Sequence, residues 1–128
     1  MENPTSEKKV WSQWFEIPVT DMSLAKKFYE TVMDTTLEVN NFGGFEMAIF
    51  PHSTVGCALC IGEGYEPSTK GVTVYINANP NLETILGRIE AAGGQIVLPK
   101  TEISPEHGYM ALFIDTEGNR LALHSDPE

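Results

Sequence analysis

Apolar and polar residues alternate near the start of the chain and then change to the spacing of a helix. Residues 14–19 place every second side chain on one face, as in a half-buried strand. This apolar face consists of Phe15, Ile17 and Val19. A helix is expected next, because Thr20 and Asp21 can act as N-caps and the following apolar residues recur at i, i+4. Its apolar stripe comprises Leu24, Phe28 and Val32, widened by Ala25 and Tyr29.

Three short strands complete the first half of the pattern. They are expected at residues 37–39, 45–50 and 57–61. The segments between them, 41–44 and 51–54, contain Gly, Asn, Pro and Ser and are typical of turns.

The second half repeats this order of elements. Residues 72–78 alternate as a half-buried strand, with Val72, Val74, Ile76 and Ala78 facing inward. Asn79 and Pro80 are expected as the N-cap and first residue of a helix whose apolar face lies within residues 82–89, before Gly93 and Gly94 end it. Further strands are expected at 95–98, 109–114 and 120–124.

The two halves also share short stretches of sequence. Residues 47–50 resemble residues 110–113, and residues 57–60 resemble residues 121–124 at nearly the same offset. Shared order and offset together favour an internal repeat of two βαβββ modules. The expected organisation is a polar tail (1–10) and one domain (11–128), made of module one (11–62), a linker (63–70) and module two (71–126).

Two such modules side by side predict an α+β fold. Their strands form a curled, mostly antiparallel eight-stranded sheet with both helices outside, so the opposite face is free to enclose a cavity. Alternation along the strands then assigns the cavity-lining positions. They are Trp14 and Glu16 on the first strand, Thr73, Tyr75 and Asn77 in module two, and Arg120, Ala122 and His124 on the last strand.

Composition narrows the range of partners. Eight Lys and Arg against 18 Asp and Glu give a formal charge of -10, which disfavours nucleic acids and anionic membranes. A strongly anionic ligand is also disfavoured, unless Arg120 or Lys70 contacts it. The chain has no long apolar run, no apolar segment at its start and only two cysteines, so a cytoplasmic protein without a disulfide framework is expected.

Two segments carry a resemblance to a known superfamily. Residues 14–29 resemble the opening strand and helix of vicinal oxygen chelate proteins, and residues 114–123 resemble the closing hairpin with its "D-P-x-G-N" pattern. The superfamily includes glyoxalase I, extradiol dioxygenases and bleomycin-resistance proteins, and the chain most resembles the group described as related to lactoylglutathione lyase. The resemblance implies paired βαβββ modules around a U-shaped cavity, a small-molecule ligand and a homodimer.

Metal-dependent members of this superfamily place ligands on the first and last strands of each module. By resemblance, those positions are Trp14, Ala58, Thr73 and Ala122 here. These four side chains offer one hydroxyl, whereas a divalent cation needs several convergent O or N donors. No metal cofactor and no metal-dependent glyoxalase I activity are therefore expected. The alternative is a divalent metal held by a non-standard set drawn from His107, His124, and Glu16 or Glu102.

Glu16 and His124 are the candidate catalytic residues. Glu16 is interpreted as a general base or as a carboxylate that binds a cationic ligand group, and His124 as a proton shuttle or ligand-orienting donor. In the alternative interpretation, a neighbouring Tyr or Arg satisfies Glu16, and His124 is a partly exposed histidine near the C-terminus.

The remaining cavity positions are candidate ligand-binding residues. Trp14 and Tyr75 provide aromatic walls or are ordinary core aromatics, and Thr73 lies on the same predicted surface. Arg120 either holds an anionic group or faces solvent or an acidic partner. Residues three apart on a strand face opposite ways, so Cys57 and Cys60 are expected to be separate buried thiols, with Cys60 on the cavity side.

His107 lies in the segment 102–108, which is interpreted either as a lid over the cavity or as a solvated loop. In the second interpretation His107 is a solvated histidine, as is His52 in the turn at 51–54.

Two functions remain open. One is a metal-independent protein that binds a small molecule, and the other is a lyase, isomerase or dioxygenase-type enzyme that uses Glu16 and His124 or a non-standard metal site. A third, an interaction protein with a filled cavity, is also compatible with the sequence.

Overall fold

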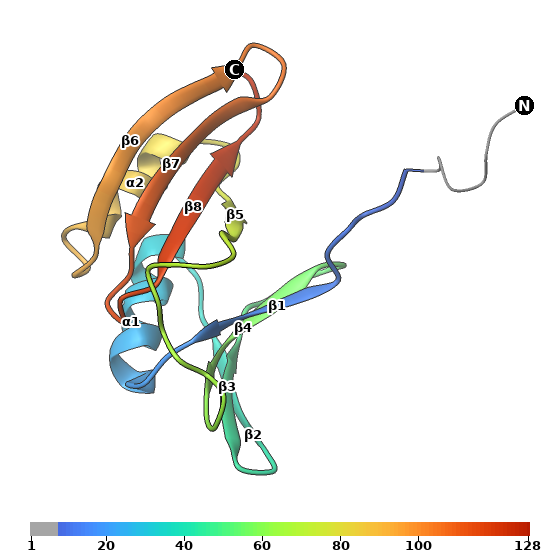
Figure 1. Ribbon diagram of the computed structural model, residues 1–128. Coiled ribbons are helices and arrows are strands. Elements are labelled where there is room, and N and C mark those ends of the chain that lie inside the picture. Colours follow the sequence, from blue (N-terminus) through green and yellow to red (C-terminus); the bar gives the residue numbers. More distant parts are fainter. Residues whose placement is uncertain (1–7) are drawn as a thin grey trace, which may run out of the picture.

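The chain folds into two modules that have the predicted order of strand, helix and three strands (Figure 1). The structure is a computed structural model and describes residues 8–128; the first seven residues of the predicted tail lie outside the described residues. Module one comprises β1 (Trp14–Pro18), α1 (Met22–Met33), β2 (Glu38–Phe42), β3 (Phe45–Ile49) and β4 (Gly56–Ile61). Module two comprises β5 (Tyr75–Asn77), α2 (Leu82–Ile89), β6 (Gln95–Ser104), β7 (Gly108–Ile114) and β8 (Arg120–Ser125).

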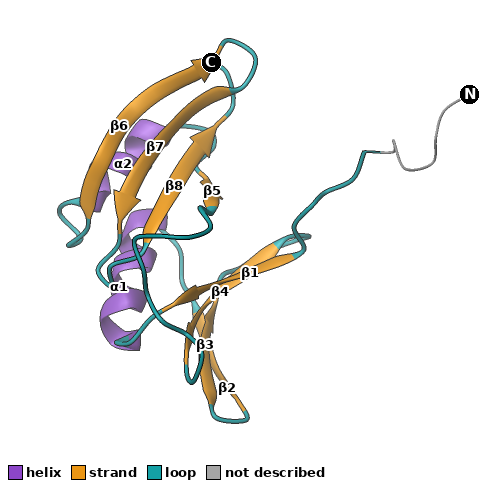
Figure 2. Cartoon of the chain, viewed as in Figure 1, coloured by secondary structure: helices purple, strands orange, loops and turns teal. Residues whose placement is uncertain are grey.

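Each module contains one four-stranded mixed sheet (Figure 2). The strand orders are β1-β4-β3-β2 and β5-β8-β7-β6. In both sheets the first strand pairs in parallel with the last, and the other neighbours are antiparallel. The predicted α+β fold of two βαβββ modules is confirmed. Its eight strands are divided between two sheets, and within residues 8–128 no strand pairing joins one sheet to the other.

Helix α1 buries one face and begins at a side-chain cap. The Asp21 carboxylate accepts a hydrogen bond from the Leu24 backbone N–H at 3.0 Å, which satisfies one free donor of the first turn. The buried face consists of Ala25, Phe28, Tyr29 and Val32. Leu24, which the i, i+4 stripe included, is 45% exposed because the buried face is centred nearer Ala25 and Tyr29.

The fifth strand is shorter than its alternation predicts. β5 pairs with β8 only from Tyr75 onward, opposite Ala122, and the Ala122 backbone N–H donates to the carbonyl of Val74. Val72 precedes this pairing and is 92% exposed, so the prediction that it faces the core is wrong. Val72 is exposed because no strand pairs with this part of the chain, so there is no sheet face on which its side chain could be buried.

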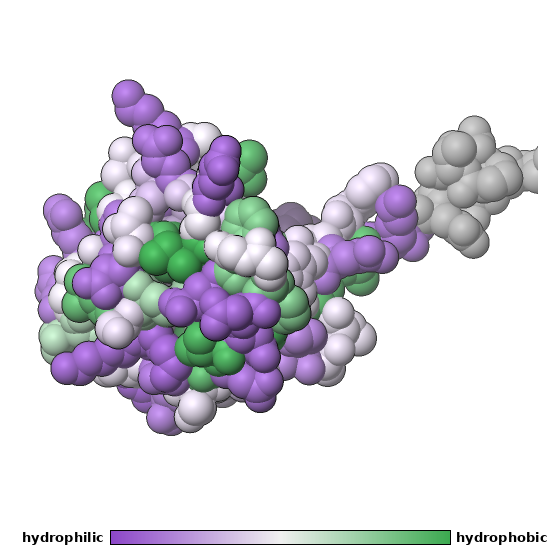
Figure 3. All heavy atoms as spheres, turned by 90° about the horizontal axis from the view of Figure 1, so that it is seen from below, coloured by the Kyte–Doolittle hydropathy of each residue, from purple (hydrophilic) through white to green (hydrophobic). Residues whose placement is uncertain are grey.

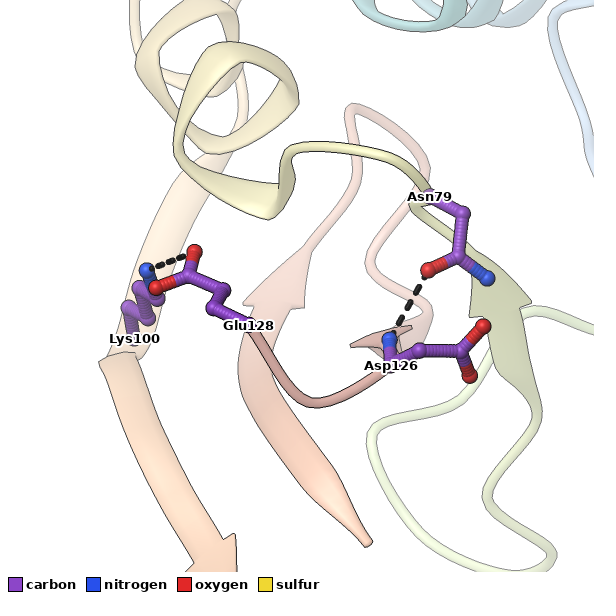
Figure 4. Close-up of polar contacts among 4 residues, drawn as sticks. All are labelled: Asn79, Lys100, Asp126 and Glu128. Atoms are coloured by element: carbon purple, nitrogen blue, oxygen red, sulfur yellow. Dashed lines mark hydrogen bonds and ion pairs between the residues drawn. The ribbon is translucent and has the colours of Figure 1, made fainter. Parts of the chain in front are cut away.

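The start of α2 also differs from its prediction. The N-cap is Asn81 and Leu82 is the first helical residue, so the assignment of Asn79 and Pro80 to these positions is wrong. The Asn79 carboxamide has another partner: its Oδ1 accepts the Asp126 backbone N–H at 2.8 Å (Figure 4). This hydrogen bond and the ion pair between Lys100 and Glu128 attach residues 126–128 to the rest of module two.

The segment around His107 is a tight turn. β6 extends to Ser104, and β7 begins at Gly108, which pairs with Ser104. The His107 ring Nδ1 lies 2.9 Å from Ser104 Oγ. His107 is exposed in this turn, which agrees with the interpretation of a solvated histidine, and the continuation of β6 shortens the loop expected at 102–108.

The apolar core is continuous between the modules. The Phe28 ring of α1 lies 6.2 Å from the Phe113 ring of β7, measured between centroids, and both side chains are buried. β1 contributes Ile17, the residue after β1 is Val19, which is also in the core, and β8 contributes Leu121 and Leu123. Seen from below, hydrophilic side chains surround small separate hydrophobic patches (Figure 3). Within residues 8–128, neither helix is long and apolar enough to cross a bilayer.

The turn between β7 and β8 joins the two modules through hydrogen bonds. Its Asn119 side chain donates to the Pro18 carbonyl at 2.7 Å and accepts the Ser68 backbone N–H at 3.1 Å. Asp115 accepts the Tyr29 hydroxyl at 2.6 Å. Residues 115–119 belong to module two and contact β1, α1 and the linker, so we call them the inter-module turn.

The turn also caps α1 from outside its own module. The Glu117 carboxylate Oε1 accepts hydrogen bonds from Thr20 Oγ1 and the Asp21 backbone N–H, each at 2.9 Å, and from the Thr20 backbone N–H. A carboxylate at this position also interacts favourably with the dipole of the helix N-terminus.

Replacing Asn119 with Ala should lower the free energy of unfolding by about 2 to 3 kcal/mol, because the buried Asn119 carboxamide loses its hydrogen bonds to the Pro18 carbonyl and the Ser68 N–H. Urea denaturation would measure this loss. Asn41→Ala is the matched control, since Asn41 is exposed on the edge strand β2, and its effect should be under about 0.5 kcal/mol. Equal effects of the two variants would contradict the role assigned to the inter-module turn.

Candidate functional site

The alternation of β1 places Glu16 and Trp14 away from the core. Ile17 and Val19 are buried, whereas Glu16 is half-buried and Trp14 is 39% exposed. The face predicted for these two residues is therefore confirmed. Phe15, which the pattern assigned to the core, is only partly buried and packs against it.

Glu16 accepts hydrogen bonds at both carboxylate oxygens. The Tyr65 hydroxyl donates to Oε1 at 2.5 Å, and the Trp14 indole N–H donates to Oε2 at 3.2 Å. Hydrogen bonding to Glu16, followed by burial, raises the pKa of Tyr65 to about 12. The alternative interpretation, a carboxylate satisfied by a neighbouring tyrosine, describes this arrangement. Tyr65 was missed because it lies in the linker, where no periodicity indicates which way a side chain points.

Cys60 lies beside this group and Cys57 does not. Burial and then the Glu16 charge raise the pKa of Cys60 to about 11. Burial raises the pKa of Cys57 to about 12. Both cysteines are free, as predicted, and Cys60 is on the same face of the sheet as Glu16, because it lies two residues after Ala58, the partner of Glu16 on β4. A thiol with a raised pKa is almost entirely protonated at neutral pH and is a poor nucleophile.

A pocket of about 320 Å³ lies between the modules, and we call it the inter-module pocket. β1, the linker, the segment before β5 and the start of β8 all contribute to it. Its lining comprises Phe15, Glu16, Ile17, Pro18, Glu66, Ser68, Lys70, Val72, Val74, Asn119, Arg120 and Leu121. The walls are thus apolar side chains from both modules, with charged groups of both signs among them.

Arg120 projects into this pocket from β8. It is half-buried, and its Nη1 donates to Thr73 Oγ1 at 3.3 Å. Among residues 8–128 the ion pairs are Lys26–Glu30 and Lys100–Glu128, so the predicted alternative of an acid-paired Arg120 is wrong in this part of the chain. The inter-module pocket therefore brings together two of the predicted site residues, Glu16 and Arg120.

His124 belongs to a different part of the surface. Its Nε2 lies 2.7 Å from the His107 carbonyl, to which it can donate, near the turn between β6 and β7. Glu16 has Tyr65 and Trp14 as its partners, so the two predicted catalytic residues are bonded to separate segments. Glu16 and His124, which were expected to act as a pair, therefore have no direct contact in the structure.

The predicted aromatic walls are exposed rather than part of the core. Tyr75 is 52% exposed and lines two neighbouring pockets of about 550 and 370 Å³, of which the smaller also includes Thr73. The Trp14 ring meets the His52 ring edge-on, with centroids 5.6 Å apart. Both aromatic side chains are therefore exposed, and of the two it is Tyr75 that lines these pockets.

The positions that carry metal ligands in the superfamily do not fit a divalent cation here. Ala58 and Ala122 present buried methyl groups, Trp14 donates its N–H to Glu16, and the Thr73 hydroxyl contacts Arg120. Within residues 8–128 no group of three or more His, Cys, Asp or Glu side chains is arranged to hold a metal ion. This finding includes the non-standard set: the His107 ring lies against Ser104 Oγ and the His124 ring against the His107 carbonyl, without a third donor side chain from that set.

The fold and the sequence define the same class of protein. Residues 11–123 match the Glyoxalase/Bleomycin resistance protein/Dioxygenase superfamily, so the chain belongs to this family. A search among curated protein sequences finds no match.

Solved structures share this fold at low sequence identity. A glyoxalase/bleomycin resistance protein from Albidiferax ferrireducens T118 has a TM-score of 0.71 and 15% identity, over 90% of this chain and 98% of that chain. The hypothetical protein SA1046 from S. aureus has a TM-score of 0.62 and 21% identity, over 96% and 99%. A glyoxalase I mutant from Zea mays has a TM-score of 0.66 and 18% identity, over 88% of this chain and 44% of that chain.

The stability of the fold should decrease at alkaline pH. The Cys60 pKa is raised from 9.0 to about 11, so above pH 9 the unfolded chain releases this proton while the folded chain keeps it. The unfolding free energy should therefore fall as the pH rises from 9 to 11, measured by urea denaturation. Cys60→Ala should show a shallower fall than the wild type. Parallel curves for the two proteins would show that the buried thiol does not contribute.

Proposed function

We propose that this protein binds a small organic molecule in the inter-module pocket without a metal ion. The observation that carries the proposal is the pocket lining, in which apolar side chains from both modules surround Glu16, Lys70 and Arg120. Ligand pockets usually combine apolar walls with a few polar groups that fix the orientation of the ligand. A volume of about 320 Å³ suits a small organic molecule.

The site favours recognition by charge and hydrogen bonds over metal chemistry. Family members that use metal place donor side chains where this chain has Ala58 and Ala122, and a methyl group supplies no donor atom. The polar groups at or beside the pocket include the Glu16 carboxylate, which accepts from Tyr65 and Trp14, and the Arg120 guanidinium.

A lyase, isomerase or dioxygenase-type enzyme is the second candidate. The observation in its favour is the 2.5 Å hydrogen bond between Tyr65 and Glu16, which pairs a phenol and a carboxylate at the pocket wall. Such a pair can hold or move a proton during general acid–base catalysis. In this candidate Tyr65 takes the position next to Glu16 that the sequence assigned to His124.

A thermal-shift screen of small organic molecules should give ligands that raise the melting temperature. Val72→Trp should abolish these shifts, because Val72 lies on the pocket wall and is exposed enough to accept a larger side chain without disturbing the core. Val39→Trp is the matched control, since Val39 is 42% exposed on the edge strand β2. Ligands that stabilise the Val72→Trp variant fully would place binding elsewhere.

Protein purified without a chelator should contain no stoichiometric Zn, Ni, Mn or Fe in elemental analysis. Glu16→Gln should change ligand affinity alone if the protein is a binder, whereas the enzymatic candidate requires a loss of turnover. Stoichiometric metal that is lost on replacement of Glu16 or His124 would overturn the metal-independent proposal.

A further inference from the structure

We infer that the ligand of the inter-module pocket carries a carboxylate, which binds between Arg120 and Lys70. This inference rests on the proposed function and adds the chemical class of the ligand. Both cations line the same pocket, one from the start of β8 and the other from the end of the linker.

Arg120 is a half-buried cation without an acidic partner. Two of the eight Lys and Arg residues, Lys26 and Lys100, form ion pairs among residues 8–128, and Arg120 forms none there. Within the same residues its side chain has one hydrogen bond, to the Thr73 hydroxyl at 3.3 Å. A partly buried guanidinium with a single acceptor has lost water without replacing all of its hydrogen bonds. An oxyanion of the ligand supplies acceptors that match its planar donors.

The acidic residues of the pocket do not fill this role. Both oxygens of Glu16 already accept hydrogen bonds, from Tyr65 and Trp14, which turn the carboxylate toward β1 and the linker. Glu66 is exposed at the rim and forms no ion pair within residues 8–128. Neither carboxylate of the pocket lining is therefore paired with Arg120 or Lys70 within residues 8–128.

Lys70 adds a second positive charge at the same wall. It is exposed and has no ion pair among residues 8–128, and its backbone N–H donates to Ser68 Oγ at 3.0 Å, which fixes the end of the linker. The Asn119 carboxamide is occupied by Pro18, Ser68 and Asp115, so it does not compete for the ligand.

The rest of the ligand should be apolar. Val72, Val74 and Leu121 line the pocket next to the two cations, and Ile17 lies across from them on β1. A carboxylate with a compact aromatic or aliphatic body would place its charge on Arg120 and Lys70 and its apolar part on these walls.

The probes for the test are phenylacetate and its neutral analogue phenylacetamide, titrated into the whole protein to about 50 mM. NMR of the arginine Nε–H groups reports directly on Arg120. Phenylacetate should cause a saturable shift of the Arg120 signal, and phenylacetamide should bind at least about tenfold more weakly. Arg120→Gln should weaken phenylacetate binding, followed on backbone amide signals of the pocket, by at least about tenfold.

Three further variants separate the contributions of the individual charges. Lys70→Gln should weaken phenylacetate binding severalfold, and Glu66→Gln should strengthen it by removing a negative charge at the rim. Lys27→Gln removes an equal charge from an exposed position on α1 and should leave binding unchanged.

Two outcomes would overturn the inference. Equal binding of phenylacetate and phenylacetamide at the pocket would leave the small-molecule function in place and remove the carboxylate. Absence of a saturable Arg120 shift up to about 50 mM phenylacetate would also reject a carboxylate site, because a built site binds a matching anion below this concentration. The proposed function would then be judged separately by the thermal-shift screen with Val72→Trp.

Discussion

The hydrogen bonds of the inter-module turn are the contacts on which the rest of this structure depends. The two sheets share no strand pairing within residues 8–128, so their relative position is set by α1 packing and by this turn. The Asn119 carboxamide connects β1 with the linker, and Glu117 and Asp115 connect module two with α1. Because these groups are mostly buried, leaving their partners unsatisfied is costly, which favours one arrangement of the modules.

The same contacts determine the geometry of the inter-module pocket. Arg120 directly follows Asn119, and its backbone N–H donates to the Ser68 carbonyl, while the Asn119 side chain accepts from the Ser68 N–H. Lys70 then follows Ser68 after one residue. The positions of both cations are therefore consequences of the bonds that join the modules, and the pocket exists only when the modules are joined.

The sequence predicted most of the fold because periodicity reports burial against a neighbouring element. It gave the order of the elements and the outward faces of Trp14 and Glu16, but it failed where burial depends on distant partners. Val72 has the alternation of a strand and no strand beside it, and Tyr65 reaches Glu16 from an aperiodic linker. The lack of an acidic partner for Arg120 is a tertiary property that no local pattern contains.

Two of the positions that carry metal ligands in the superfamily hold buried alanines in this chain, Ala58 and Ala122. Ala58 pairs with Glu16 across β4 and β1, and Ala122 pairs with Tyr75 across β8 and β5, so each replaced position lies next to a polar side chain. A buried methyl group needs no partner, whereas a buried carboxylate needs a cation or several hydrogen-bond donors, as Asp115 has. The alanines therefore need no metal ion in order to be buried stably at these two positions. In the proposed function, recognition of the ligand falls to the charged groups of the inter-module pocket, Glu16, Lys70 and Arg120.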